Sequence, residues 1–113
     1  MKFNADRIPV VEAYLRESFP DAEIERLYRT SDPFRLHEKP HEHDAEMWRA
    51  ETPTHFFDLG ISDEFMEDHN PENLASSLRS LKIAGQLMDC PNRHRLWIMR
   101  GYITTAPLGE APF

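Results

Sequence analysis

The sequence predicts a small α+β domain, a mostly antiparallel sheet of four to five strands packed with two helices, in the order α-β-β-β-β-α-β. Two segments repeat apolar residues at helical spacing, several short segments are rich in aromatic and branched residues, and proline-containing turn signals separate them. A chain of 113 residues has room for one domain. We expect this domain to span residues 1–105 and to be followed by a loose, proline-containing tail over residues 106–113.

The first predicted element is a helix over residues 6–18. We expect Asp6 to cap its N-terminus, and Pro9 falls in the first turn, where its missing N–H costs little. The residue before Pro20 is driven out of the helical region, so the helix ends there. Apolar residues at steps of three and four form one stripe, which comprises Ile8, Val11, Leu15 and Phe19.

Short strands follow this helix. Residues 22–30 predict an exposed or half-buried strand, and residues 34–37 a short extended piece after a turn at Pro33. Residues 38–44 are polar and charged, which is typical of a loop.

The next predicted unit is a hairpin, with strands over residues 46–51 and 54–61 and a turn at Thr52-Pro53. Because side chains alternate along a strand, Phe56 lies on one face of the second strand. The opposite face carries Phe57, Leu59 and Ile61.

Asn70-Pro71-Glu72 is the clearest helix start in the chain. It combines a capping residue, a proline at the first helical position and an acid near the positive end of the helix dipole. The leucine spacing that follows predicts one helix over residues 71–88. Before it, Ser62 is expected to cap a short turn over residues 63–68.

The last predicted strand, residues 95–105, is apolar on both sides. Leu96 and Ile98 point one way, and Trp97, Met99 and Ile103 the other, as in a central strand covered on both faces. Two short helices leave part of such a sheet uncovered, so we expect a partner, most simply a second copy of the chain. The candidate partner-binding residues are Trp48, Phe56, Phe65, Met66 and Trp97.

The composition of the chain limits which partners and which cellular compartment we expect. With 20 acidic and 13 basic residues the net charge is −7, which repels phosphate backbones and makes nucleic acid an unexpected partner. No apolar run approaches the ~18 residues of a membrane span. The first twenty residues lack the apolar block of a signal peptide, and Cys90 is the only cysteine, which fits a reducing compartment. We expect a cytoplasmic protein.

A histidine-rich segment, residues 37–46, suggests a second functional hypothesis, a metal site, beside the partner-binding surface. In extended chain, the imidazoles of His41 and His43 lie on the same side, and two imidazoles plus a carboxylate form a common donor set for zinc or non-haem iron. His37 or Glu46 could complete such a site. The opposing interpretation is a solvated polar loop, since loops attract such residues.

Nucleophilic catalysis finds little support in the sequence. Cys90 precedes His94 by four residues, but a proline-broken turn lies between them, and no glycine-rich nucleophile or phosphate-binding motif is present. We therefore expect a small, acidic, non-catalytic interaction or regulatory module that self-associates. A metal-binding protein or metal-dependent enzyme using His37, His41 and His43 is the alternative, and an acidic inhibitor that mimics nucleic acid is a weaker one.

Overall fold

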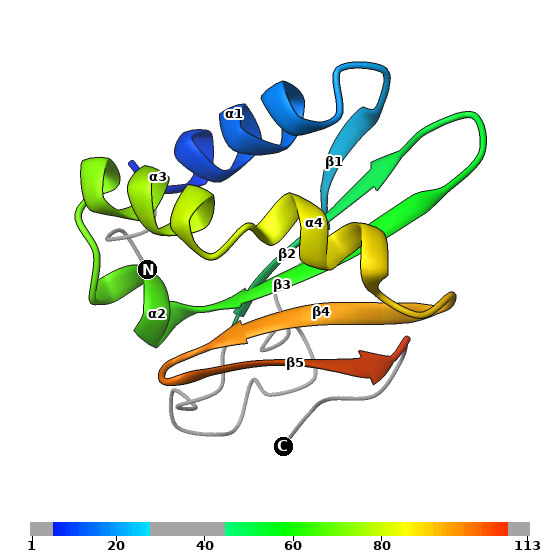
Figure 1. Ribbon diagram of the computed structural model, residues 1–113. Coiled ribbons are helices and arrows are strands. Elements are labelled where there is room, and N and C mark those ends of the chain that lie inside the picture. The colour runs from blue at the N-terminus through cyan, green and yellow to red at the C-terminus, as the bar shows by residue number, and fades with distance from the viewer. Residues whose placement is uncertain (1–5, 28–44, 109–113) are drawn as a thin grey trace.

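A five-stranded mixed sheet with helices stacked on one face forms the fold in the computed structural model, which describes residues 6–27 and 45–108 (Figure 1). The prediction of an α+β domain is confirmed. The elements in chain order are α1 (Ile8–Ser18), β1 (Glu23–Leu27), β2 (Ala45–Glu51), β3 (Phe56–Ser62), α2 (Asp63–Glu67), α3 (Pro71–Ser80), α4 (Ile83–Asp89), β4 (His94–Met99) and β5 (Tyr102–Pro107).

The five strands lie side by side in chain order, β1-β2-β3-β4-β5. Neighbouring strands are antiparallel except for β3 and β4, which run parallel from Asp58↔Arg95 to Ile61↔Ile98. Parallel neighbours need a crossover, and α2, α3 and α4 supply it. The predicted extended piece at residues 34–37 lies outside the described residues.

The main core lies between the helices and one face of the sheet. Each helix contributes the apolar residues of one side, and the strands contribute alternate residues. On β3 these are the three that the sequence pattern placed on one face. The buried members of this core include Val11, Leu15, Trp48, Leu59, Ile61, Leu74, Leu78, Ile83, Leu87, Leu96 and Ile98.

The N-terminus of α1 is held by a tertiary contact in place of the predicted cap. Asp6 was expected to cap the helix, but the N-cap is Arg7, which makes no side-chain capping bond. The carboxylate of Asp6 pairs with the Arg7 guanidinium at 2.9 Å. Arg7 Nε in turn donates to the backbone oxygens of Met66 and His69, both at 2.8 Å. These bonds fix the start of α1 against α2 and the segment that follows it.

The predicted helix over residues 71–88 is two helices in the structure. Its start is confirmed, because Asn70 Oδ1 accepts the N–H of Asn73 at 2.8 Å. Lys82, however, takes a left-handed conformation with φ of 54°, which ends α3 and begins α4. The change of direction lets α4 bury Ile83 and Leu87 while Met88 stays exposed.

The predicted last strand is a hairpin, because the chain reverses at Arg100-Gly101. Gly101 has φ of +86°, a conformation that glycine adopts without steric cost. β4 is nevertheless the interior strand that the two-sided apolar pattern predicts, with β3 and β5 as neighbours and both faces buried. Ile103 lies on the helix face and not beside Trp97, since the turn reverses the chain between them.

The second face of the sheet carries a smaller buried cluster. It includes Trp97, whose ring lies against Gly60 so closely that a Cβ on the glycine would come within 2.7 Å of the indole. None of the cluster's residues belongs to α1–α4; its buried members are Ala45, Met47, Trp97, Met99 and Ala106. No helix among the described residues is long and apolar enough to cross a membrane.

Candidate binding cleft

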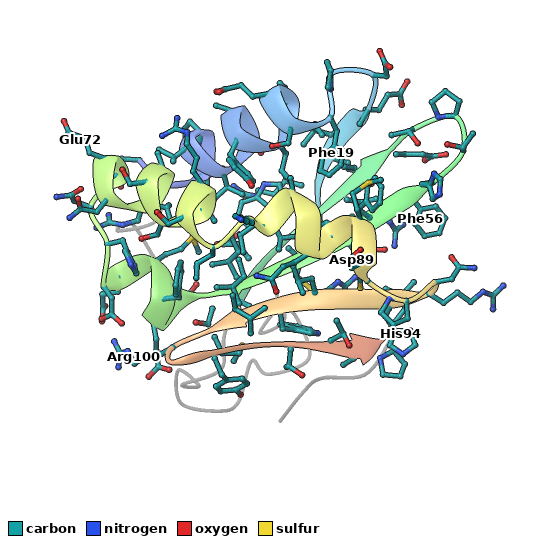
Figure 2. All side chains as sticks on the ribbon, viewed as in Figure 1. Phe19, Phe56, Glu72, Asp89, His94 and Arg100 are labelled. Carbon is teal, nitrogen blue, oxygen red and sulfur yellow. The ribbon has the colours of Figure 1, made fainter. Side chains whose placement is uncertain are left out.

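A cleft of about 660 Å³ opens where β3 and β4 part, a volume typical of ligand pockets. The parallel ladder begins at Asp58↔Arg95, so Phe56 and Phe57 pair with β2 on one side and border the cleft on the other. The β2–β3 hairpin forms one wall, and the end of α4 with the chain leading into β4 forms the other. In Figure 2, Phe56, Asp89 and His94 gather at this end of the sheet, away from Arg100.

The tip of the β2–β3 hairpin is held by local hydrogen bonds. Thr52 N–H donates to the His55 oxygen at 2.7 Å, and the Thr52 hydroxyl accepts the N–H of His55 at 3.0 Å. The imidazole of His55 is nearly parallel to the ring of Phe57, with centroids 5.9 Å apart. Both residues line the cleft, so these contacts fix the side chains of one of its walls.

A buried carboxylate, that of Asp58, lines the cleft where β3 and β4 begin to pair. Asp58 is 2% exposed, and its Oδ1 accepts Arg49 Nε at 2.9 Å and lies 3.6 Å from a terminal nitrogen of Arg95. Within the part of the chain that the structure describes, neither Asp58 Oδ2 nor Arg95 Nε has a hydrogen-bond partner. Because the three residues come from β3, β2 and β4, this cluster ties the strands together at the point where β3 and β4 begin to pair.

The thiol of Cys90 is half-buried in the cleft and is not activated. Its burial raises the pKa of the thiol, and the negative charge of Asp58 raises it further. The thiolate is the reactive form of cysteine, so the surroundings oppose nucleophilic chemistry. His94 also lines the cleft, and its Nδ1 lies 3.0 Å from the backbone oxygen of Asn92. The surroundings of the Cys90 thiol therefore do not activate it as a nucleophile.

Two large apolar side chains on the cleft face solvent. Phe56 on β3 is 48% exposed and Met88 on α4 is 58% exposed. The guanidinium carbon of Arg49 lies 5.1 Å from the centre of the Phe56 ring. Aromatic residues, methionine and arginine are enriched at protein–protein interfaces, so this composition is typical of a binding surface.

The structure separates the five predicted partner-binding residues. Phe56 is exposed at the cleft. Trp48 is fully buried, and its indole N–H donates to Glu12 at 3.2 Å. Phe65 and Met66 pack into the main core from α2, and Trp97 lies in the buried cluster on the second face. Phe56 is thus the member of this set that a partner can reach without opening the core, and the binding role of the set stays a prediction.

The predicted metal site lies largely outside the described residues. His37, His41 and His43 belong to the segment that the structure does not describe. Glu46 is buried on β2, with its carboxylate 3.8 Å from Arg26 Nε. Within residues 6–27 and 45–108, no group of three or more His, Cys, Asp or Glu side chains could hold a metal ion. A zinc or iron site at the histidine-rich segment stays a prediction.

The sequence signals for Met88 and for the cleft itself were weak. Leucine spacing allowed either Leu87 or Met88 to face the core, and since adjacent helix positions point in different directions, one of them had to be exposed. Cys90 and His94 stood out only as a pair four residues apart.

Comparisons with protein-family models, with curated proteins and with solved structures gave no match to this chain.

Proposed function

We propose that this chain is a non-catalytic protein-interaction module that binds an extended segment of a partner protein in the cleft between β3 and β4. The observation that carries this proposal is the pair of exposed apolar side chains, Phe56 and Met88, which border one cleft from β3 and from α4. Aromatic residues and methionine are enriched at such interfaces, and aromatic anchors that become buried on binding supply much of the affinity.

The unpaired side of β3 supports an extended ligand. The parallel ladder does not reach Phe56 and Phe57, so on the cleft side no described strand pairs with them. A peptide strand can bind such an edge through main-chain hydrogen bonds, while its side chains fill neighbouring pockets. Phe56 and Met88 would then select an apolar side chain.

The raised pKa of Cys90 supports binding without covalent chemistry, because the thiol stays protonated near neutral pH.

We also propose a cytoplasmic location, supported by a chain whose one cysteine is a free thiol. Self-association is part of the same proposal, supported by one edge of the sheet that carries no charged side chain.

The test uses a displayed library of random linear peptides selected on the wild-type protein. The selected peptides are then titrated against wild type, the double variant Phe56→Ser/Met88→Ser, and the control Leu81→Ser, which removes a comparably exposed apolar side chain away from the cleft. We expect a loss of affinity of about tenfold or more in the double variant and none in the control. Peptides that bind all three proteins equally, or the absence of any enriched peptide, would overturn the proposal.

A further inference from the structure

The two edge strands of the described sheet differ in charge. β1, Glu23–Leu27, carries three charged residues among five, which is one way natural proteins keep sheet edges from pairing with other chains. β5, Tyr102–Pro107, carries none, and its Ile103, Thr104 and Thr105 are β-branched residues that favour strands. The outer edge of β5 therefore lacks the charges that protect β1, and its one protecting residue is Pro107 at the end of the strand, beyond Ile103–Thr105.

The outer edge of β5 presents main-chain hydrogen-bonding groups. Met99 and Tyr102 close the two-residue turn and form a hydrogen-bonded pair, so bonding to β4 recurs at every second residue of β5 from Tyr102 onward. The residues between them, Ile103 and Thr105, direct their N–H and C=O groups away from β4. No described strand pairs with β5 on that side.

These features make β5 complementary to itself. We propose that two copies of this chain associate through β5, whose outer edges pair antiparallel about a two-fold axis at Thr104 and join the two sheets into one. Ile103 of each copy then lies opposite Thr105 of the other, and each such pair exchanges two main-chain hydrogen bonds. Thr104 meets its own counterpart, a favourable cross-strand pair, and Tyr102, which is 46% exposed, lies opposite Ala106 of the second copy.

Charge also favours β5 over β1 as the place where copies meet. Each chain carries a net charge of −7, yet residues 93–108 contain no Asp or Glu. The three arginines of this stretch lie outside β5, and β5 itself is uncharged, so pairing through it places no like charges opposite each other. The same symmetric pairing of β1 about Glu25 would place this carboxylate opposite itself, which is destabilising.

The test is sedimentation velocity of the full chain over a wide range of protein concentration, with two variants of β5. Thr105→Pro removes an outward N–H that β4 does not use, and proline is tolerated at such edge positions. Thr104→Lys places like charges together at the two-fold axis. The control Ser76→Lys adds the same charge on an exposed position of α3. We expect a wild-type dimer, an unchanged control, and dissociation constants about tenfold or more higher in both β5 variants.

Amide hydrogen exchange reports on the same interface without a mutation. The amides of Ile103 and Thr105 should be protected at dimer-forming concentrations and lose that protection on dilution, whereas the Thr104 amide, bonded to β4, should be protected at both. This inference rests on the proposed self-association. A wild type that is monomeric throughout would overturn both, while a wild-type dimer that the β5 variants leave intact would overturn the β5 interface alone.

Discussion

The two ends of the parallel pair β3 and β4 are built differently. At the Ile61↔Ile98 end, β3 continues directly into α2: the buried Ser62 hydroxyl accepts the N–H of Phe65 at 3.0 Å. The β4–β5 turn closes the same end, and its Arg100 holds the Asp68 carboxylate at 2.7 and 2.8 Å. At the Asp58↔Arg95 end, the strands part and the cleft opens.

This difference shows that connection geometry places the cleft. The closed end has a helix cap in direct continuation of β3 and a two-residue turn after β4, so little chain projects beyond the last pair. At the open end the β2–β3 hairpin and the segment from α4 to β4 both extend past Asp58↔Arg95, and their side chains form the walls. No helix cap stabilises this end of the described sheet, and the ion pairs of Asp58 with Arg49 and Arg95 connect β3 to β2 and β4 there.

The largest expected effect is therefore at the open end. Asp58→Ala leaves the guanidinium groups of Arg95, 12% exposed, and Arg49, 33% exposed, without their buried carboxylate. Breaking a fully buried ion pair costs about 3–5 kcal/mol of unfolding free energy, and we expect a loss at the lower end, about 3 kcal/mol, because both arginines are partly exposed. Urea denaturation followed by circular dichroism measures the change. Glu51→Gln, an exposed carboxylate on the same hairpin, is the control, and a loss no larger than its own would contradict the role given to Asp58.

A smaller effect is expected at the closed end. Ser62→Ala removes the cap of α2 and leaves the Phe65 N–H unsatisfied, which costs about 1 kcal/mol. The exposed Ser76→Ala on α3 should change the unfolding free energy very little. Because the cap lies at the far end of the strands, peptide binding at the cleft should be unchanged in Ser62→Ala; weakened binding would show that the two ends are not independent.

The smallest expected effect is on the pKa of the Cys90 thiol. Its pKa is raised by burial and by the charge of Asp58, since a nearby negative charge disfavours the thiolate. Asp58→Asn removes that charge, so the pKa should fall and the rate of alkylation by iodoacetamide should begin to rise at lower pH than in wild type. Asp89→Asn, next to the cysteine in sequence, should leave the profile unchanged; coincident profiles for wild type and Asp58→Asn would contradict the assignment.

Most local signals in the sequence predicted local features correctly; the cap expected at Asp6 is the exception, because α1 begins after Arg7 without a side-chain cap. Asn70 and Ser62 both act as the caps that their positions before helical segments indicate. The alternation around Phe57 predicted which side of β3 packs into the main core and left Phe56 on the other. These features depend on residues within one turn or one strand, where propensity and periodicity carry the information.

Features that depend on tertiary structure were not predictable in the same way. The left-handed Lys82 divides one expected helix because α4 must turn to lay Ile83 and Leu87 on the sheet. Gly101, the one glycine in the segment expected to form the last strand, lies in the turn between β4 and β5. The cleft brings together His55, Cys90 and His94, whose proximity follows from the pairing of β3 with β4 and from no local pattern.

The parallel ladder also sets the order in which the chain can fold. β2–β3 and β4–β5 join neighbouring segments, whereas Asp58 and Arg95 are 37 positions apart. Closing a long loop costs entropy before any contact repays it, and distant pairings slow folding. We expect the two hairpins to form early and their alignment through the crossover to limit the folding rate. Redesigning the cleft at Asp58 would then slow folding as well as alter binding.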